Sequence, residues 1–342
     1  MTVLSKSTKI ILNYVFGIGL FAWLSYSIYH QLRYKDNLQL SVHQLKQSIH
    51  THQTAIIIVF AMMFLNWSIE AWKWRILIRP LEKISFRKSF YAILSGVSFS
   101  VNTPNHIGEY GGRVLYLKGE NRLPAISATF VGSISQFITT VIFGSIGVVY
   151  FISHFGLNFR NRLLQDYLWN LLIFIFVLAT AALVIFLYFR LSLIVSLFER
   201  IEWLRRFKKY VVIMADFPRP TLLKVILLSM LRYVVFSAQY LILLEVMGVE
   251  MLWWQGFAMI FLLYLVMAMI PSITIADLGI RGEAGLYFFG LLSANKIGII
   301  AGTLGVWLIN LVIPAIFGSL LLLGIKVLNG NKTAVVLNKQ QV

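Results

Sequence analysis

Residues 98–113 read SFSVNTPNHIGEYGGR, and this stretch decides how the rest of the chain can fold. It closes an uncharged run, residues 89–108, that is long enough to resemble a membrane span. The stretch then brings a Thr-Pro pair, two adjacent glycines and the charged residues Glu109 and Arg113. Broken backbone and ionisable groups are tolerated at membrane depth only where protein buries them or where they line a wet cavity. We therefore expect this stretch to lie inside the protein and not to face lipid.

A second stretch near the other end of the chain repeats this chemistry. Residues 270–283 read IPSITIADLGIRGE, with a proline, hydroxyls and glycines followed by Asp277, Arg281 and Glu283. We expect the two stretches to face each other and to form a site.

The composition is that of a polytopic membrane protein. Of 342 residues, 59% are hydrophobic and 13% charged, and the mean hydropathy is +0.80. A soluble protein could not bury so much apolar surface. The net charge of +17 gathers in short loops between apolar runs, as the positive-inside rule predicts, so we expect no nucleic-acid partner. The chain has no cysteine, no phosphate-binding loop and no metal-ligand motif, and we expect neither a cofactor nor a metal.

Two basic loops determine the expected topology. Residues 73–88 carry six Lys/Arg and residues 190–221 carry seven, so both should be cytoplasmic. Three apolar runs lie between them, and three full crossings would put the loops on opposite sides. The conflict disappears if residues 89–118 form a re-entrant hairpin that enters from the cytoplasm, breaks at residues 103–113 and returns.

The same logic makes residues 251–295 a second hairpin, which dips in from the outside and breaks at residues 271–283. Residues 10–29 are expected to be an uncleaved first span. The predicted fold is all-α, with about six full spans and two re-entrant helical hairpins in an inverted-topology repeat. One membrane domain, residues 1–342, would then comprise two inverted halves, residues 1–160 and 161–328. Both termini would be in the cytoplasm, with the protein in the cell inner (plasma) membrane.

The basic segment 190–221 has two interpretations. Its apolar residues and Trp203 are compatible with an amphipathic helix on the anionic inner surface, and an ordinary basic loop explains it as well.

The first stretch offers a candidate site. Pro104 disfavours helix at Thr103, so the helix should stop there, and the free N–H groups of the next turn, near Gly108, would attract anions. Glu109 and Arg113 are four residues apart and can pair on one helical face. This pair could equally be a structural bridge that holds the hairpin shut.

Other deep polar residues extend the site. Asp277 and Arg281 are also four residues apart, Gly279 permits close backbone approach, and Glu283 follows. Arg232 lies about 12 Å into an apolar run and needs an anionic partner, for which we expect Asp277 or Glu283.

Three further polar residues receive less definite roles. Glu70 is expected to be an anchor residue close to the inner interface. Gln136 and Asn310 would bond across helices or line the path of a substrate.

The segments SVNTPNHIGEYGGR and PSITIADLGIRGEAG resemble the signature stretches of the lysylphosphatidylglycerol synthase transmembrane (flippase-like) family. The resemblance covers nearly the whole chain. It implies a membrane domain that moves an anionic or aminoacylated phospholipid, or a polyprenyl-linked lipid, between leaflets. It assigns motif positions to Thr103, Pro104, Gly108, Glu109, Arg113, Gly279, Arg281 and Glu283. Only seventeen residues follow Ile325, so we expect neither the soluble aminoacyl-transfer domain of bifunctional members nor lysyl transfer from tRNA.

We therefore expect a membrane lipid as the substrate and no enzymatic activity. Two alternatives remain: an enzyme that uses His106 and Glu109 as acid and base on a lipid headgroup, and an ion-coupled exporter of a small solute. His106 could also simply cap the loop. A homo-oligomer and a separate synthase partner are both compatible with the sequence, which does not name the lipid or the direction of its movement.

Overall fold

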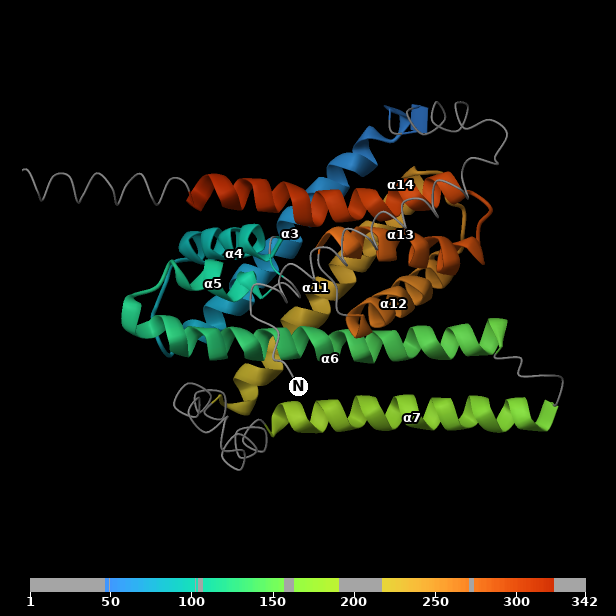
Figure 1. Ribbon diagram of the computed structural model, residues 1–342, viewed down its shortest axis with the longest axis horizontal. Coiled ribbons are helices and arrows are strands. Elements are labelled where there is room, and N and C mark those ends of the chain that lie inside the picture. The colour runs from blue at the N-terminus through green and yellow to red at the C-terminus, as the bar shows by residue number, and fades with distance from the viewer. Residues whose placement is uncertain are drawn as a thin grey trace, which may run out of the picture.

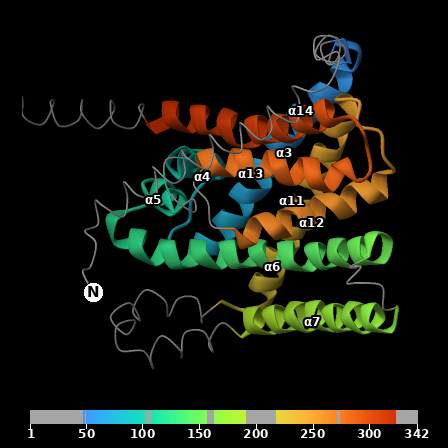
Figure 2. The ribbon, with the colours of Figure 1, turned by 45° about the vertical axis from the view of Figure 1, so that its right-hand side comes forward.

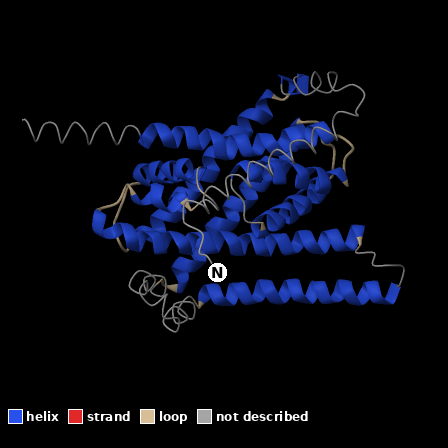
Figure 3. Ribbon diagram, in the orientation of Figure 1, coloured by secondary structure: helices blue, strands red, loops and turns tan. Residues whose placement is uncertain are grey.

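The structure is a computed structural model that describes residues 47–48, 50–101, 103, 107–156, 163–190, 217–270 and 274–322. The expected first span, most of the basic segment 190–221 and the C-terminus lie outside these residues, so the predictions for them stay predictions. All regular secondary structure in the described residues is helical, which confirms the all-α class (Figure 3).

Five of the described helices are long and apolar enough to cross a membrane. They are α3 (Gln53–Ile78), α6 (Arg122–Phe155), α7 (Leu163–Phe189), α11 (Arg219–Val246) and a last helix that begins with α14 (Lys296–Trp307), continues through the π-helix η3 (Leu308–Val312) and extends to residue 322. These helices match five of the six predicted spans. The sixth, residues 10–29, is not described.

Helices α3 and α11 form the antiparallel pair at the centre of the bundle. Hydrogen bonds between them join Val59 to Gln239, Asn66 to Arg232, and Lys73 to Ser229. Residue numbers rise along α3 as they fall along α11, so the two helices run in opposite directions. The C-terminal end of α3 therefore lies beside the N-terminal end of α11.

The predicted break in the first stretch is confirmed. Helix α4 (Phe86–Val101) ends there, and α5 (Gly108–Val114) runs back along it. A Cβ added at Gly112 would lie 2.6 Å from the carbonyl oxygen of Ser95, so the two backbones are in direct contact. With sixteen residues, α4 is about 24 Å long and shorter than a full span.

The two ends of the first hairpin are joined at one junction. Glu82 precedes α4, and its carboxylate accepts hydrogen bonds from the Lys118 amide at 3.0 Å and from the Asn121 side chain at 3.3 Å. Lys88 completes the junction with an ion pair to Glu82 at 3.2 Å. The chain therefore leaves and re-enters the helical bundle at the same end.

The second hairpin has the same design. It consists of α12 (Trp253–Met269) and α13 (Thr274–Gly290). The helix α12 ends where the predicted break begins, but residues 274–283, which were expected to belong to the break, are helical. Asn295 follows the hairpin, and its side-chain amide donates to the carbonyl oxygens of Met247 (3.2 Å) and Gly248 (2.8 Å), which precede the hairpin. Because α3 and α11 are antiparallel, the two hairpins start from opposite ends of the bundle (Figure 1).

Each hairpin packs against a long helix from a distant part of the sequence. Helix α12 contacts α6, where a Cβ at Gly147 would lie 2.6 Å from the carbonyl oxygen of Ala258. Helix α4 contacts the end of the last helix, where the hydroxyls of Ser98 and Ser319 are 2.7 Å apart. Small residues allow this close approach between membrane helices. Helix α7 lies at the edge of the bundle, beside α6 (Figure 2).

Candidate functional site

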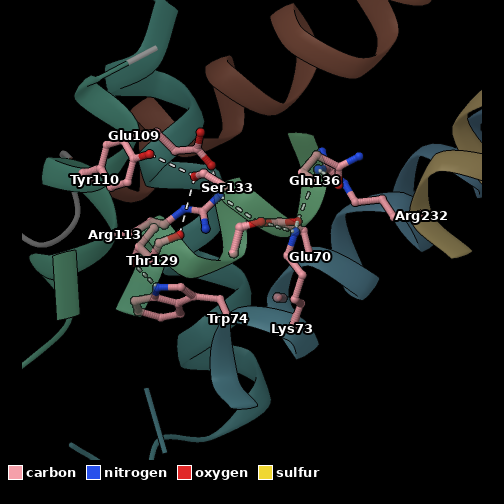
Figure 4. Close-up of polar contacts among 12 residues, drawn as sticks. Glu70, Lys73, Trp74, Glu109, Tyr110, Arg113, Thr129, Ser133, Gln136 and Arg232 are labelled. Carbon is pink, nitrogen blue, oxygen red and sulfur yellow. Dashed lines mark hydrogen bonds and ion pairs between the residues drawn. The ribbon is translucent and has the colours of Figure 1, made fainter. Parts of the chain in front are cut away.

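Glu70 is the centre of a buried charge cluster. Its Oε2 lies 2.7 Å from Lys73 Nζ and 3.2 Å from Arg232 Nη1, and its Oε1 lies 3.1 Å from Arg113 Nη2 (Figure 4). These groups come from α3, α11 and α5. Glu70 is 3% exposed, Lys73 1% and Arg113 4%. Buried charges are tolerated when they are paired, so each partner depends on the others.

The prediction that Glu70 is an interfacial anchor is therefore wrong. The residue lies near the end of the apolar run, but α11 and the returning arm α5 cover the face of α3 that carries it. Trp72, two residues later, points outward and is exposed. One sequence signal was available: Asn66 and Glu70 are four residues apart and share a helical face.

Arg232 does need an anion, but Asp277, one of its two expected partners, does not supply it. Glu70 holds it, whereas Asp277 pairs elsewhere. Its Nε donates to Asn66 Oδ1 at 2.9 Å and its Nη1 donates to Gln136 Oε1 at 3.2 Å. The guanidinium also lies over the ring of Trp67, 5.1 Å from the centroid. The guanidinium is thus fixed in position by four side chains.

The ion pair between Glu109 and Arg113 is confirmed. Arg113 is shared, however, because its Nη2 also contacts Glu70. Thr103 and Gly108 shape the break that precedes this pair. Thr103 Oγ1 accepts the Gly108 amide at 2.7 Å, and a Cβ at Gly108 would lie 2.3 Å from the carbonyl oxygen of Phe99. Both residues therefore have a structural role, while Pro104 and His106 lie outside the described residues.

The second stretch forms its own pair, as predicted. Arg281 Nη2 lies 2.9 Å from Asp277 Oδ2, and Arg281 Nη1 donates to the hydroxyl of Tyr264 at 2.7 Å. Tyr264 belongs to α12 and was missed by the sequence reasoning, although a tyrosine in the middle of an apolar run is a usable signal. Gly279 is buried on α13, and Glu283 is half-buried there.

A pocket of about 220 Å³ adjoins both the Glu70 cluster and the Asp277–Arg281 pair. It is lined by Asn66, Gln136, Thr140, Arg232, Tyr233, Phe236 and Tyr264. Two of these lining residues connect the pocket to the charged groups: Arg232 is paired with Glu70, and Tyr264 accepts a hydrogen bond from Arg281. No described residue of either stretch lines the pocket: Arg113 is linked to it through Glu70 and Arg232, and Arg281 through Tyr264. The expectation that the two stretches face each other stays a prediction.

The polar residues Gln136 and Asn310 take both of the roles considered for them. Gln136 bonds to Arg232 and lines the pocket. Asn310, in the π-helix η3, joins Asn66 at 3.3 Å to Gln239 at 2.9 Å and so links three helices.

The charges of the Glu70 cluster do not balance. Two carboxylates, Glu70 and Glu109, face three cations, Lys73, Arg113 and Arg232. The side chain of Arg232 is 20% exposed and is the most accessible of the three cations. Arginine binds phosphate through two parallel hydrogen bonds, so the chemistry of this wall suits a phosphate group. Among the described residues, no group of three acidic or histidine side chains converges on a metal site.

The family model described as the lysylphosphatidylglycerol synthase TM region matches residues 10–318. A comparison with curated proteins gives no match. The matched region contains both hairpins, the Glu70 cluster, four of the five long apolar helices described above and most of the fifth. This chain is therefore a multi-pass membrane protein that belongs to the lysylphosphatidylglycerol synthase transmembrane-region family.

Proposed function

We propose that this protein moves a lipid with an anionic or aminoacylated headgroup between leaflets, without ATP and without chemical change to the lipid. A phospholipid or a polyprenyl-linked lipid fits this proposal. One observation carries it: a buried cluster with a cationic surplus presents Arg232 to a pocket that is lined by residues of α3, α6, α11 and α12. Charges at this depth are costly and mark substrate pathways in membrane proteins.

The membrane arrangement is part of the proposal. The two hairpins would be re-entrant, each with both ends on one side, and the halves would form an inverted repeat. The junctions at Glu82 and Asn295 support this arrangement, as does the antiparallel pair of α3 and α11. The basic residues around Glu82 would face the cytoplasm of the cell inner membrane, together with both termini.

The cluster suggests how a headgroup would be received. A lipid phosphate would replace Glu70 as the partner of Arg232, while Glu70 stays with Lys73 and Arg113. An uncompensated buried charge costs about 3–5 kcal/mol, so the ion pair would open only as the phosphate arrives. Asn66 and Gln136 would hold the guanidinium in place during the exchange.

The part of the pocket that Tyr264 lines would take the rest of the headgroup. Tyr264 is oriented by Arg281, which Asp277 neutralises. An amino group on an aminoacylated headgroup would engage Asp277 there. Movement between leaflets would follow from rocking one half against the other across the interface of α3 and α11.

The test is lipid exchange in proteoliposomes. Headgroup-labelled phosphatidylglycerol, lysylphosphatidylglycerol and a polyprenyl phosphate are each offered, and an impermeant quencher reports how fast inner-leaflet label becomes accessible. We expect faster exchange for at least one of them and loss of that rate in Arg232→Gln. The control is Tyr188→Phe, which removes a buried hydroxyl that donates to the carbonyl oxygen of Leu222; neither residue belongs to the Glu70 cluster or lines the pocket. Exchange of none of the lipids would contradict the proposal, and so would full activity in Arg232→Gln.

A further inference from the structure

A second pocket lies where α3 ends and the chain turns toward α4. Its volume is about 340 Å³, and it is lined by Trp72, Arg75, Ile76, Arg79, Lys83 and Ile84. It shares no lining residue with the pocket beside Arg232. Arg75 Nε donates to the carbonyl oxygen of Ile84 at 3.0 Å, and this bond fixes the loop that closes one side of the pocket.

The lining is strongly cationic. It contains three basic side chains and no acidic one. The nearby carboxylate, Glu82, is engaged by Lys88, the Lys118 amide and Asn121. The C-terminal dipole of α3 offsets only about half a charge. The pocket therefore keeps an excess of about two and a half positive charges. The positive-inside rule explains basic residues on this side of the membrane, but it does not gather them around a cavity.

We propose that this pocket binds the headgroup of an anionic phospholipid from the adjacent leaflet. Trp72 is 58% exposed, as is usual for an indole at the membrane interface, and Ile76 beside it offers an apolar path for the acyl chains. Basic pockets at the cytoplasmic ends of helices hold lipid phosphates in this way. The site is separate from the transport pathway and requires only that the chain lies in a membrane.

The experiment uses the full-length protein in phosphatidylcholine nanodiscs that contain a graded fraction of phosphatidylglycerol. Native mass spectrometry counts the phosphatidylglycerol retained. The double variant Arg79→Gln/Lys83→Gln removes two pocket charges and keeps Arg75, which holds the loop. The matched control Lys118→Gln/Lys224→Gln removes two exposed charges at the same end of the bundle but outside the pocket.

Each cation near an anionic lipid strengthens binding about fivefold, so the pocket variant should bind phosphatidylglycerol about 25-fold more weakly. The control should bind like wild type. Equal losses in both variants would overturn the proposal in favour of diffuse surface charge, and an unchanged pocket variant would overturn it outright. Inorganic phosphate that displaces the lipid at equal concentration would identify a site for soluble anions instead. Arg79→Lys keeps the charge and should retain the lipid, and loss of the lipid in this variant would contradict the charge argument.

Discussion

Arg232 Nη1 on α11 lies 3.2 Å from Glu70 Oε2 on α3, so one buried ion pair joins the two antiparallel helices at the centre of the bundle. Lys73 and Arg113 contact the same carboxylate. Glu70 thus connects the central helices to the first hairpin. Any substrate that takes Arg232 from Glu70 would change a contact between α3 and α11.

Glu70→Gln should destabilise the protein strongly. The variant removes the negative charge that Lys73, Arg113 and Arg232 share, and an unpaired buried charge costs about 3–5 kcal/mol. The thermal unfolding midpoint in detergent should fall by several degrees. Glu120→Gln, an exposed carboxylate on η2 (Gly119–Asn121), is the control and should leave the midpoint unchanged. Equal midpoints for the two variants would show that the cluster does not depend on Glu70.

Gly112→Ala should disrupt the first hairpin, whereas Gly111→Ala should not. A Cβ at Gly112 would meet backbone atoms of Ser95 and Gly96 under 3 Å, but a Cβ at Gly111 would meet nothing within 4 Å. Overpacking costs about 1–3 kcal/mol, while alanine in an exposed helical position gains about 0.5–1 kcal/mol over glycine. Unfolding midpoints of the two variants should therefore move in opposite directions. A parallel shift would mean that α4 and α5 are not in backbone contact.

Tyr264→Phe should slow lipid exchange in a protein that still folds. The change leaves Arg281 Nη1 without its acceptor, which costs about 1–3 kcal/mol, and alters the lining of the pocket that Arg232 also lines. Exchange rates in proteoliposomes measure the effect. Tyr287→Phe, an exposed tyrosine on α13, serves as the control. Identical exchange by both variants would remove Tyr264 from the pathway.

The re-entrant arrangement can be tested by labelling, because the natural chain has no cysteine. Single cysteines at exposed positions 83 and 118 should react with an impermeant maleimide from one side of the membrane, and those at exposed positions 250 and 296 from the other. Each pair brackets one hairpin. Labelling of 83 and 118 from opposite sides would make that segment a full span.

The first hairpin should loosen in acid. Burial alone would raise the pKa of Glu82, but the Lys118 amide, Asn121 and Lys88 outweigh it and hold that pKa below its ordinary value. The stability that this carboxylate contributes is therefore present above its ordinary pKa, about 4.3, and is lost as the pH falls through the lower folded value. Unfolding midpoints should show this acid loss in the wild type. Glu82→Gln should lack this acid-dependent fall in the unfolding midpoint. If the variant and the wild type gave the same pH profile, the proposed role of the junction would be refuted.

The breaks in the helices were predictable from sequence because their causes are local. Proline removes a donor and restricts the residue before it, and the spacing of Glu109 to Arg113 and of Asp277 to Arg281 defines pairs within one helix. Charge counting between loops then indicated that each segment returns to its own side, a prediction that the labelling experiment above addresses.

The partners of Arg232 could not be predicted in this way. They depend on the register between α3 and α11, which pairs residues 166 positions apart in sequence, and on α5 covering the end of α3. The same long-range packing determines that Glu70 is buried while Trp72 is exposed. Helical periodicity indicates which residues share a face, but it does not say which faces are covered.

The most direct test is to ask which molecule occupies the pocket beside Arg232. A photo-crosslinking amino acid replaces Phe236, which lines this pocket, and separately Phe176, which is exposed on α7. After illumination in membranes of mixed lipids, mass spectrometry identifies the lipids attached to each protein. We predict that adducts at position 236 are enriched in phosphate-bearing anionic or aminoacylated lipids relative to position 176, and that Arg232→Gln abolishes the enrichment. Adducts at both positions that merely follow bulk lipid composition, or no lipid adduct at position 236, would contradict a headgroup site in this pocket.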